Sequence, residues 1–160
     1  MTSRRSVAEW FDPASIRFKI SPHDDLSGVQ GGDWDLERRY PLAEAVKHRS
    51  IAQRYAEGRP WEETDLFREV YSVRIKREPI RGEYTMKGLL AQYYGRVDSM
   101  FEDLKANGFK SGRALPRLLI GRGGEVFIGN QGNHRLAMAQ ILGLERIAGE
   151  ILCRHPKCSR

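Results

Sequence analysis

The sequence has 160 residues, of which 40% are hydrophobic and 30% charged, a composition typical of a globular domain and not of a disordered chain. No apolar run approaches the roughly 18 residues needed to span a bilayer, which argues against a membrane protein. The basic N-terminus has no apolar core behind it, and the two cysteines lack metal-site or redox spacing. We therefore expect a single cytoplasmic domain over residues 1–160.

The net charge of +6 is unevenly distributed along the chain. Residues 1–112 carry 19 basic and 18 acidic side chains, whereas residues 113–160 carry 8 basic and 3 acidic side chains. Phosphate-bearing ligands, from a nucleotide to a nucleic-acid backbone, would be attracted to this basic end. A generically basic C-terminal tail is the alternative explanation.

The N-terminal part is predicted to contain little regular structure. Residues 1–14 are expected to form a loose arm, and residues 16–20 alternate apolar and basic side chains as a half-buried strand does. The glycine-rich stretch 28–35 then places a tryptophan between Asp33 and Asp35. These carboxylates either cap turns in a structural loop or, as a pair on a flexible backbone, bind Mg²⁺ or substrate.

Three helices are predicted in the middle of the chain. The first runs from Pro41 to Glu57 and ends at a glycine, and the second runs from Pro60 to near Arg74. The third, from Thr85 to Asn107, repeats apolar residues at steps of three and four. The acids Glu62 and Glu63 suit the positive end of the second helix, and a general-base role is the alternative.

The stretch 125–144 is the most informative part of the sequence. It predicts a short strand over residues 125–128, a turn containing Gly129 and Gly132, and a helix that begins at Asn133 or His134. Backbone N–H groups at such a helix start are unpaired and lie at the positive end of the helix dipole. The turn therefore predicts an anion site, above all for phosphate.

Each residue type in the turn fits this chemistry. Glycines let the backbone approach an anion, amide side chains donate hydrogen bonds, and a guanidinium offers a planar fork. His134 could donate a hydrogen bond to phosphate or carry a proton. The alternative is that His134 is a residue at the helix start that is hydrogen-bonded to the backbone. For Arg135 the alternative is a structural salt bridge. The predicted phosphate-binding residues are Gly129, Asn130, Gly132, Asn133, His134 and Arg135.

The run Gly132-Asn133-His134-Arg135, followed by Leu-Ala-x-Ala, resembles the signature loop of the ParB/sulfiredoxin-like superfamily. That loop reads roughly Gly-Glu-Arg-Arg-x-x-Ala in ParB partition proteins and Gly-Cys-His-Arg in sulfiredoxins. The similarity extends over residues 104–152 in the order helix, strand, strand, loop, helix, strand. It implies nucleotide phosphates on the turn, with ATP or CTP and Mg²⁺ as the expected cofactors.

Departures from the family narrow the expected activity. Asn133 replaces the catalytic cysteine of sulfiredoxins, which excludes sulfinic-acid reduction, and the glutamate of ParB proteins, which argues against CTP-driven switching. The DNA-reading helices of ParB proteins have no counterpart after residue 144. The superfamily also includes free-serine kinases and ParB-like nucleases, so phosphotransfer and phosphodiester or nucleotide hydrolysis stay open.

The expected fold is α+β: a small mixed sheet from strands near 16–20, 117–120, 125–128 and 147–153, with the two N-terminal helices layered over the loop end. In the enzyme hypothesis, His134 acts with Asp33 or Asp35, which also serve as metal ligands, and residues 28–35 approach the Gly132 turn. In the alternative, the same loop binds nucleic-acid backbone or serves a regulatory module without chemistry.

Overall fold

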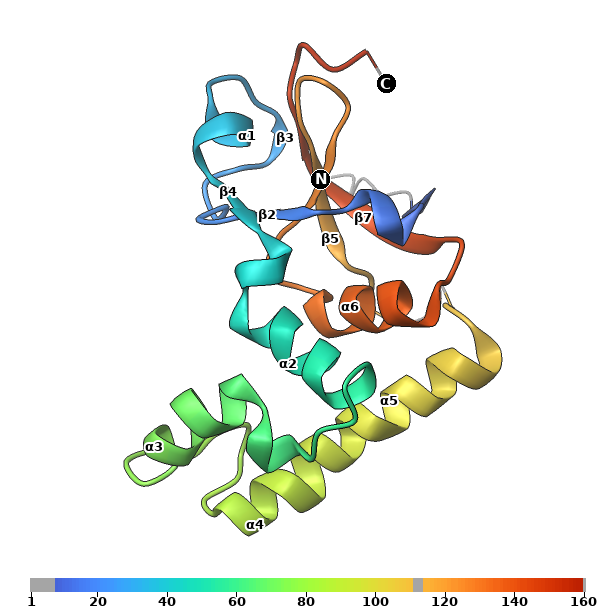
Figure 1. The fold of residues 1–160 in the computed structure, drawn as a ribbon. Coiled ribbons are helices and arrows are strands. Elements are labelled where there is room, and N and C mark those ends of the chain that lie inside the picture. The colour runs from blue at the N-terminus through green and yellow to red at the C-terminus, as the bar shows by residue number, and fades with distance from the viewer. Residues whose placement is uncertain (1–7, 111–113, 160) are drawn as a thin grey trace, which may run out of the picture.

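The computed structural model describes residues 8–110 and 114–159 and contains one mixed seven-stranded sheet with helices packed around it (Figure 1). The strand order is β1-β7-β5-β6-β2-β4, and β3 pairs with β7. The strands are β1 (Ala8–Phe11), β2 (Phe18–Ile20), β3 (Gly28–Val29), β4 (Arg39–Pro41), β5 (Arg117–Ile120), β6 (Val126–Ile128) and β7 (Ile147–Arg154). The predicted class, a mixed sheet with packed helices, is confirmed.

The helical segments lie mainly between β4 and β5 in the sequence. The α-helices are α1 (Trp34–Glu37), α2 (Val46–Tyr55), α3 (Ser72–Arg74), α4 (Met86–Gly88), α5 (Tyr94–Asn107) and α6 (Asn133–Leu142). Short 3-10 turns are η1 (Pro13–Ser15), η2 (Leu42–Glu44) and η3 (Trp61–Glu63), and η4 (Leu66–Tyr71) and η5 (Leu89–Tyr93) are π-helical. No helix in the described ranges is long and apolar enough to cross a membrane.

The four predicted strands are present, and three more were not predicted. The prediction of a loose arm is wrong for residues 8–14, because β1 pairs antiparallel with β7 and η1 follows it directly. Residues 1–7 of that arm lie outside the described residues. The three unpredicted strands have two to four residues each, too short for a period-two pattern to distinguish them from loops.

Helix α6 is the central element, because it is buried on two sides (Figure 1). Leu136 and Ala139 belong to the core against the sheet, which also contains Leu118. Ala137 and Met138 belong instead to the core formed with the helical layer. A helix that is apolar nearly all round is one enclosed on both faces.

The helical layer is more broken than predicted. The helix expected from Pro41 to Glu57 is a 3-10 turn followed by α2, and the one expected from Pro60 consists of η3, η4 and α3. The third helix begins as predicted, since the Thr85 side chain accepts a hydrogen bond from the N–H of Gly88. Both α2 and α5 pack on α6, so the layer lies against the helix that carries the predicted turn.

Candidate functional site

The predicted strand–turn–helix is present. Strand β6 ends at Ile128, Gly132 caps the helix in the left-handed region with φ 90°, and α6 begins at Asn133. The first backbone bond of the helix runs from the N–H of Leu136 to the carbonyl of Gly132, at 3.0 Å. By helix geometry the amides of residues 133–135 precede this ladder and lie at its positive end.

The two glycines of the turn are closely packed against neighbouring residues. A Cβ at Gly132 would lie 2.6 Å from Pro116, in addition to the positive φ. Gly129 is buried, and a Cβ there would lie 3.1 Å from Nε2 of His23. The lack of a side chain at these glycines therefore also makes room for Pro116 and His23, and their contact with phosphate stays a prediction.

The turn is held by backbone contacts with β5. The N–H of Gly129 donates to the carbonyl of Arg117 at 2.9 Å, and the N–H of Arg117 donates to the carbonyl of Gln131 at 3.2 Å. The side-chain amide of Asn133 donates to the carbonyl of Gly129 at 3.0 Å. This amide, predicted as a phosphate donor, is thus used to close the turn.

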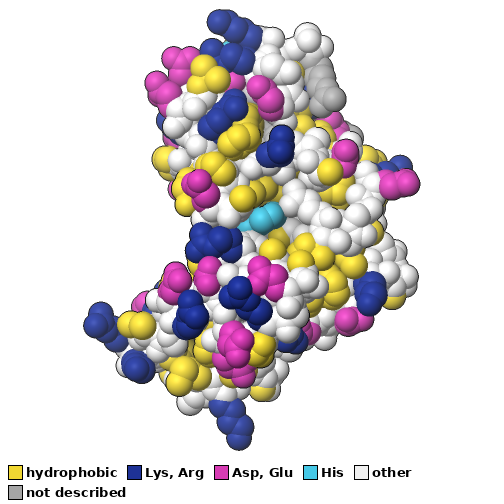
Figure 2. All heavy atoms as spheres, in the orientation of Figure 1, with side chains coloured by type: hydrophobic (Ala, Val, Ile, Leu, Met, Phe, Trp, Pro, Cys, Tyr) yellow, Lys and Arg dark blue, Asp and Glu magenta, His cyan; other side chains and the backbone are white. Residues whose placement is uncertain are grey.

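A cavity of about 570 Å³ opens at the start of α6, between the sheet and the helical layer. We call it the α6 cavity. Figure 2 shows basic side chains beside a histidine at the waist between the two halves of the molecule. The residues that line the cavity are His23, Asp24, Lys47, Arg81, Met100, Ala114, Arg117, Asn130, Gln131, Gly132, Asn133, His134 and Arg135.

Three cations of the α6 cavity, Lys47, Arg81 and Arg117, differ from most of the other arginines that the structure describes. Within residues 8–110 and 114–159, no carboxylate is in ion-pair contact with Lys47, Arg81 or Arg117. Elsewhere an acidic partner lies within 4.0 Å of Arg38, Arg39, Arg49, Arg54, Arg59, Arg68, Arg74, Arg122 and Arg154. The cavity therefore holds three positive charges that no carboxylate of the described residues contacts.

The pKa values of His134 and Lys47 reflect the same field. Burial, followed by the charges of Lys47 and Arg81, lowers the pKa of His134 to about 4, so its imidazole is neutral at pH 7. Burial also lowers the pKa of Lys47, and the charge of Arg81 lowers it further. His23 is only 7% exposed, and its Nδ1 has no hydrogen-bond partner in the described part of the chain.

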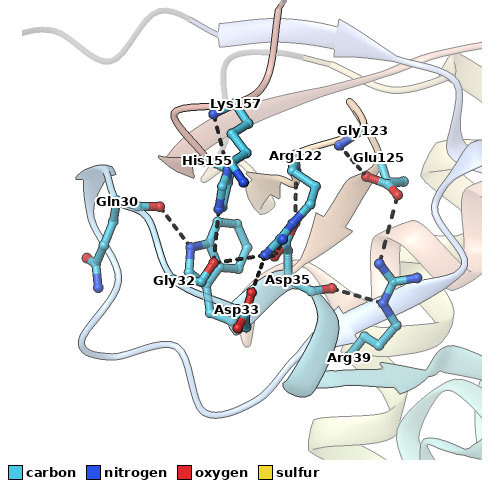
Figure 3. Close-up of polar contacts among 11 residues, drawn as sticks. Gln30, Gly32, Asp33, Asp35, Arg39, Arg122, Gly123, Glu125, His155 and Lys157 are labelled. Atoms are coloured by element: carbon cyan, nitrogen blue, oxygen red, sulfur yellow. Dashed lines mark hydrogen bonds and ion pairs between the residues drawn. The ribbon is translucent and has the colours of Figure 1, made fainter.

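Asp33 and Asp35 lie away from this cavity, in what we call the Arg122 cluster: Gly32, Asp33, Asp35, Arg122 and His155 (Figure 3). Arg122 is in the turn before β6, whereas the predicted site is in the turn after it. The Arg122 guanidinium lies 2.8 Å from Asp33 and 2.8 Å from Asp35. The predicted catalytic and metal-binding roles of these two carboxylates at the turn are wrong, because they bind an arginine at the other end of the strand.

The Arg122 cluster is saturated with hydrogen bonds. The Asp35 carboxylate is fully buried and also accepts from the backbone N–H of Arg122 at 2.8 Å. Burial alone would raise the pKa of Asp35, but the hydrogen bonds and charge of Arg122 outweigh it and lower the pKa to about 2. His155 accepts from the N–H of Lys157, so its Nε2 carries the proton and donates to the carbonyl of Gly32.

The structure also shows where side chains that could bind a metal ion lie. Among the described residues there is no group of three His, Cys, Asp or Glu side chains placed to hold a metal ion. Asp24 is the one carboxylate among the described residues that line the α6 cavity, and Glu62 and Glu63 are exposed outside it. Mg²⁺ is commonly bound by one or two carboxylates together with phosphate oxygens, and Asp24 is the residue of the described lining that has such a group.

The sequence did not point to five residues of the site: His23, Asp24, Lys47, Arg81 and Arg117. They come from four segments that meet only when the helical layer packs against the sheet. Of these five residues, only Arg117 could have been identified from the sequence, because it is a basic residue at the start of the predicted strand 117–120. Comparison of the chain with protein-family models, with curated proteins and with solved structures gives no match.

Proposed function

We propose that the protein binds a phosphate-bearing ligand, a nucleotide first of all, in the α6 cavity, as a ParB/sulfiredoxin-like domain. One observation carries this proposal: Lys47, Arg81 and Arg117 line one cavity from separate elements, and none of the described carboxylates forms an ion pair with them. They surround the start of a helix, where free amides and the helix dipole favour negative charge. An anion would neutralise charges that otherwise repel one another.

The shape of the site favours a small ligand over a nucleic-acid strand. Its volume of about 570 Å³ lies within the range of small-molecule pockets. Its lining residues come from the sheet, the turn and the helical layer. An extended strand would instead need an open basic surface that follows its backbone.

Arg135 is expected to contribute directly to binding. Its guanidinium lies over the Phe109 ring at 5.4 Å, which orients the group, and its side chain lines the cavity. A charge-assisted bond of this kind is worth on the order of 1.5–3 kcal/mol, or about 10- to 150-fold in affinity. A lysine would restore part of it, because a point charge lacks the fork geometry.

A chemical step at this site would use groups of the cavity itself. His134, neutral at pH 7, can accept a proton, and Asp24 is the one carboxylate among the described residues of the lining. Phosphotransfer and nucleotide hydrolysis both need such a group beside the bound phosphate. His134→Ala is then expected to reduce turnover more than affinity, and to reduce both equally if the imidazole only holds phosphate.

The test is a binding series with ATP, CTP and their mono- and diphosphates, with and without Mg²⁺, measured by thermal shift and calorimetry. We expect saturable stabilisation of the wild type, a loss in Arg135→Ala and partial recovery in Arg135→Lys. Arg146→Ala is the matched control, because Arg146 also lies over an aromatic ring, Trp10 at 4.5 Å, but does not line the cavity.

Two results would contradict the proposal. One is the absence of stabilisation of the wild type by any phosphate ligand. The other is steeply salt-dependent binding of nucleic acid with little affinity for nucleotides, which would support the non-catalytic nucleic-acid module instead.

A further inference from the structure

Arg81 occupies an unusual backbone position at the α6 cavity. Ile80 and Glu83 exchange two backbone hydrogen bonds, each 2.9 Å long, around the two-residue turn Arg81-Gly82. Both turn residues have positive φ, 53° and 82°. Such turns favour asparagine, aspartate or glycine, so an arginine here is held at a cost in backbone strain. Strained residues of this kind cluster at ligand-binding sites.

This turn places the side chain of Arg81 at the lining of the α6 cavity. The guanidinium carbon of Arg81 lies 5.4 Å from the centre of the Tyr93 ring, and that ring lies 6.4 Å from the ring of His134 at the start of α6. Tyr93 is buried, so it is a fixed support for the arginine. The described residues offer Arg81 no carboxylate partner.

Lys47 acts beside Arg81 on the same side of the cavity. It comes from the first turn of α2, and its pKa is lowered partly by the charge of Arg81. The helical layer thus contributes two cations that repel each other. The sheet side contributes Arg117, with the amides at the start of α6 beside it.

We infer that Arg81, together with Lys47, forms a second phosphate contact that makes the site selective for ligands with two or more linked phosphates. This inference rests on the proposed function. A single phosphate at the start of α6 satisfies the sheet side, whereas a di- or triphosphate extends to the helical layer and neutralises both of its cations. Arg81 is a specificity-determining residue, and it lies outside the 104–152 segment that carries the family resemblance.

The test compares AMP, ADP and ATP on the wild type and on Arg81→Asn. Asparagine tolerates positive φ, so this change keeps the turn while removing the charge. We expect the affinity for ATP to fall on the order of 10-fold and the affinity for AMP to change less than about 2-fold, as for loss of one charge-assisted contact. Arg81→Gly, which also fits the turn, should behave in the same way.

Arg77→Asn is the matched control, because Arg77 belongs to the same loop but does not line the cavity. It should leave all three affinities unchanged. Equal affinity of the wild type for AMP and ATP, or an equal loss for both in Arg81→Asn, would overturn this inference while leaving phosphate binding intact. A wild type that binds none of the three nucleotides would overturn the proposed function and this inference together.

Discussion

The Arg122 cluster and the α6 cavity use the same kinds of side chain for opposite purposes. In the cluster, Arg122 is enclosed by two carboxylates and a carbonyl, and every group has its partner (Figure 3). Lys47, Arg81 and Arg117 line the cavity, and no acid in the described part of the chain forms an ion pair with them. An arginine whose charge is neutralised by carboxylates stabilises the fold, whereas cations without such partners are available to an anionic ligand.

The two regions lie at opposite ends of strand β6. The turn before β6 carries Arg122, and the turn after it leads into α6. One short strand thus separates a structural contact from the proposed binding site. The two regions differ in the partners of their arginines, since both carry arginines beside polar turns.

The largest expected effect is on the cluster. Arg122→Ala leaves the fully buried Asp35 carboxylate without its cation. Breaking a buried pair from one side is strongly destabilising, so we expect the melting temperature to fall by roughly 6–20 °C. Asp33→Asn is the control, because Asp33 is exposed, and should change the melting temperature by about 2 °C or less. A small effect of Arg122→Ala would show that Asp35 has another source of stabilisation.

A large effect is also expected at the turn of the cavity. Gly132→Ala combines a positive φ with a Cβ 2.6 Å from Pro116, so it should cost about 2 kcal/mol or more of unfolding free energy and weaken phosphate binding. Gly143→Ala is matched in φ, 65°, but meets nothing within 4 Å, and should cost only about 1 kcal/mol. Equal losses measured by urea unfolding would show that the turn can move away from Pro116.

The pH dependence of the unfolding free energy should also distinguish the α6 cavity from the Arg122 cluster. The pKa of His134 is about 4 in the folded state and near 6.5 in the unfolded state. As the pH falls, the unfolded state is therefore protonated before the folded state. Stability is therefore complete above pH 6.5 and is lost as pH falls toward 4, by on the order of 1–3 kcal/mol. Asp35, with a folded pKa of about 2, keeps its contribution until the pH falls below its usual 3.8.

Urea unfolding between pH 4 and 7.5 measures this dependence. Burial lowers the pKa of His48 in the same direction, so the comparison needs His134→Gln, which should flatten the slope between pH 4 and 6.5. An unchanged slope in this variant would assign the pH dependence to other groups. Saturating phosphate ligand should also flatten it, because an anion favours the protonated imidazole.

The smallest effect on stability is expected for Arg117→Ala, which is chemically the same change as Arg122→Ala. Arg117 is exposed and forms no ion pair with the described carboxylates, so its loss should alter the unfolding free energy by less than about 0.5 kcal/mol. Affinity for a phosphate ligand should fall by on the order of 10-fold. A destabilised Arg117→Ala with unchanged affinity would reverse the assignment of the two regions.

Much of the fold could be predicted because its signals are local. The period-two pattern before Ser21 and the apolar run after Pro116 correspond to β2 and β5, and Gly143 ends α6 in the left-handed conformation, as its position predicts. The strand–turn–helix around Gly132 followed from the same signals. Strands β1, β3 and β4 could not be predicted from local signals, because they form strands through their pairing partners and not through their own residues.

The sequence by itself determined that a helix begins at Asn133 or His134 after a glycine turn, and that His134 and Arg135 stand at its positive end. Only the tertiary structure decided which charges surround it. Packing of the helical layer on α6 brings Lys47 and Arg81 to the turn, while Asp33 and Asp35 go to Arg122. The physical reason is that backbone conformation follows from neighbouring residues, whereas the electrostatics of a cavity are the sum over segments that only the folded chain brings together.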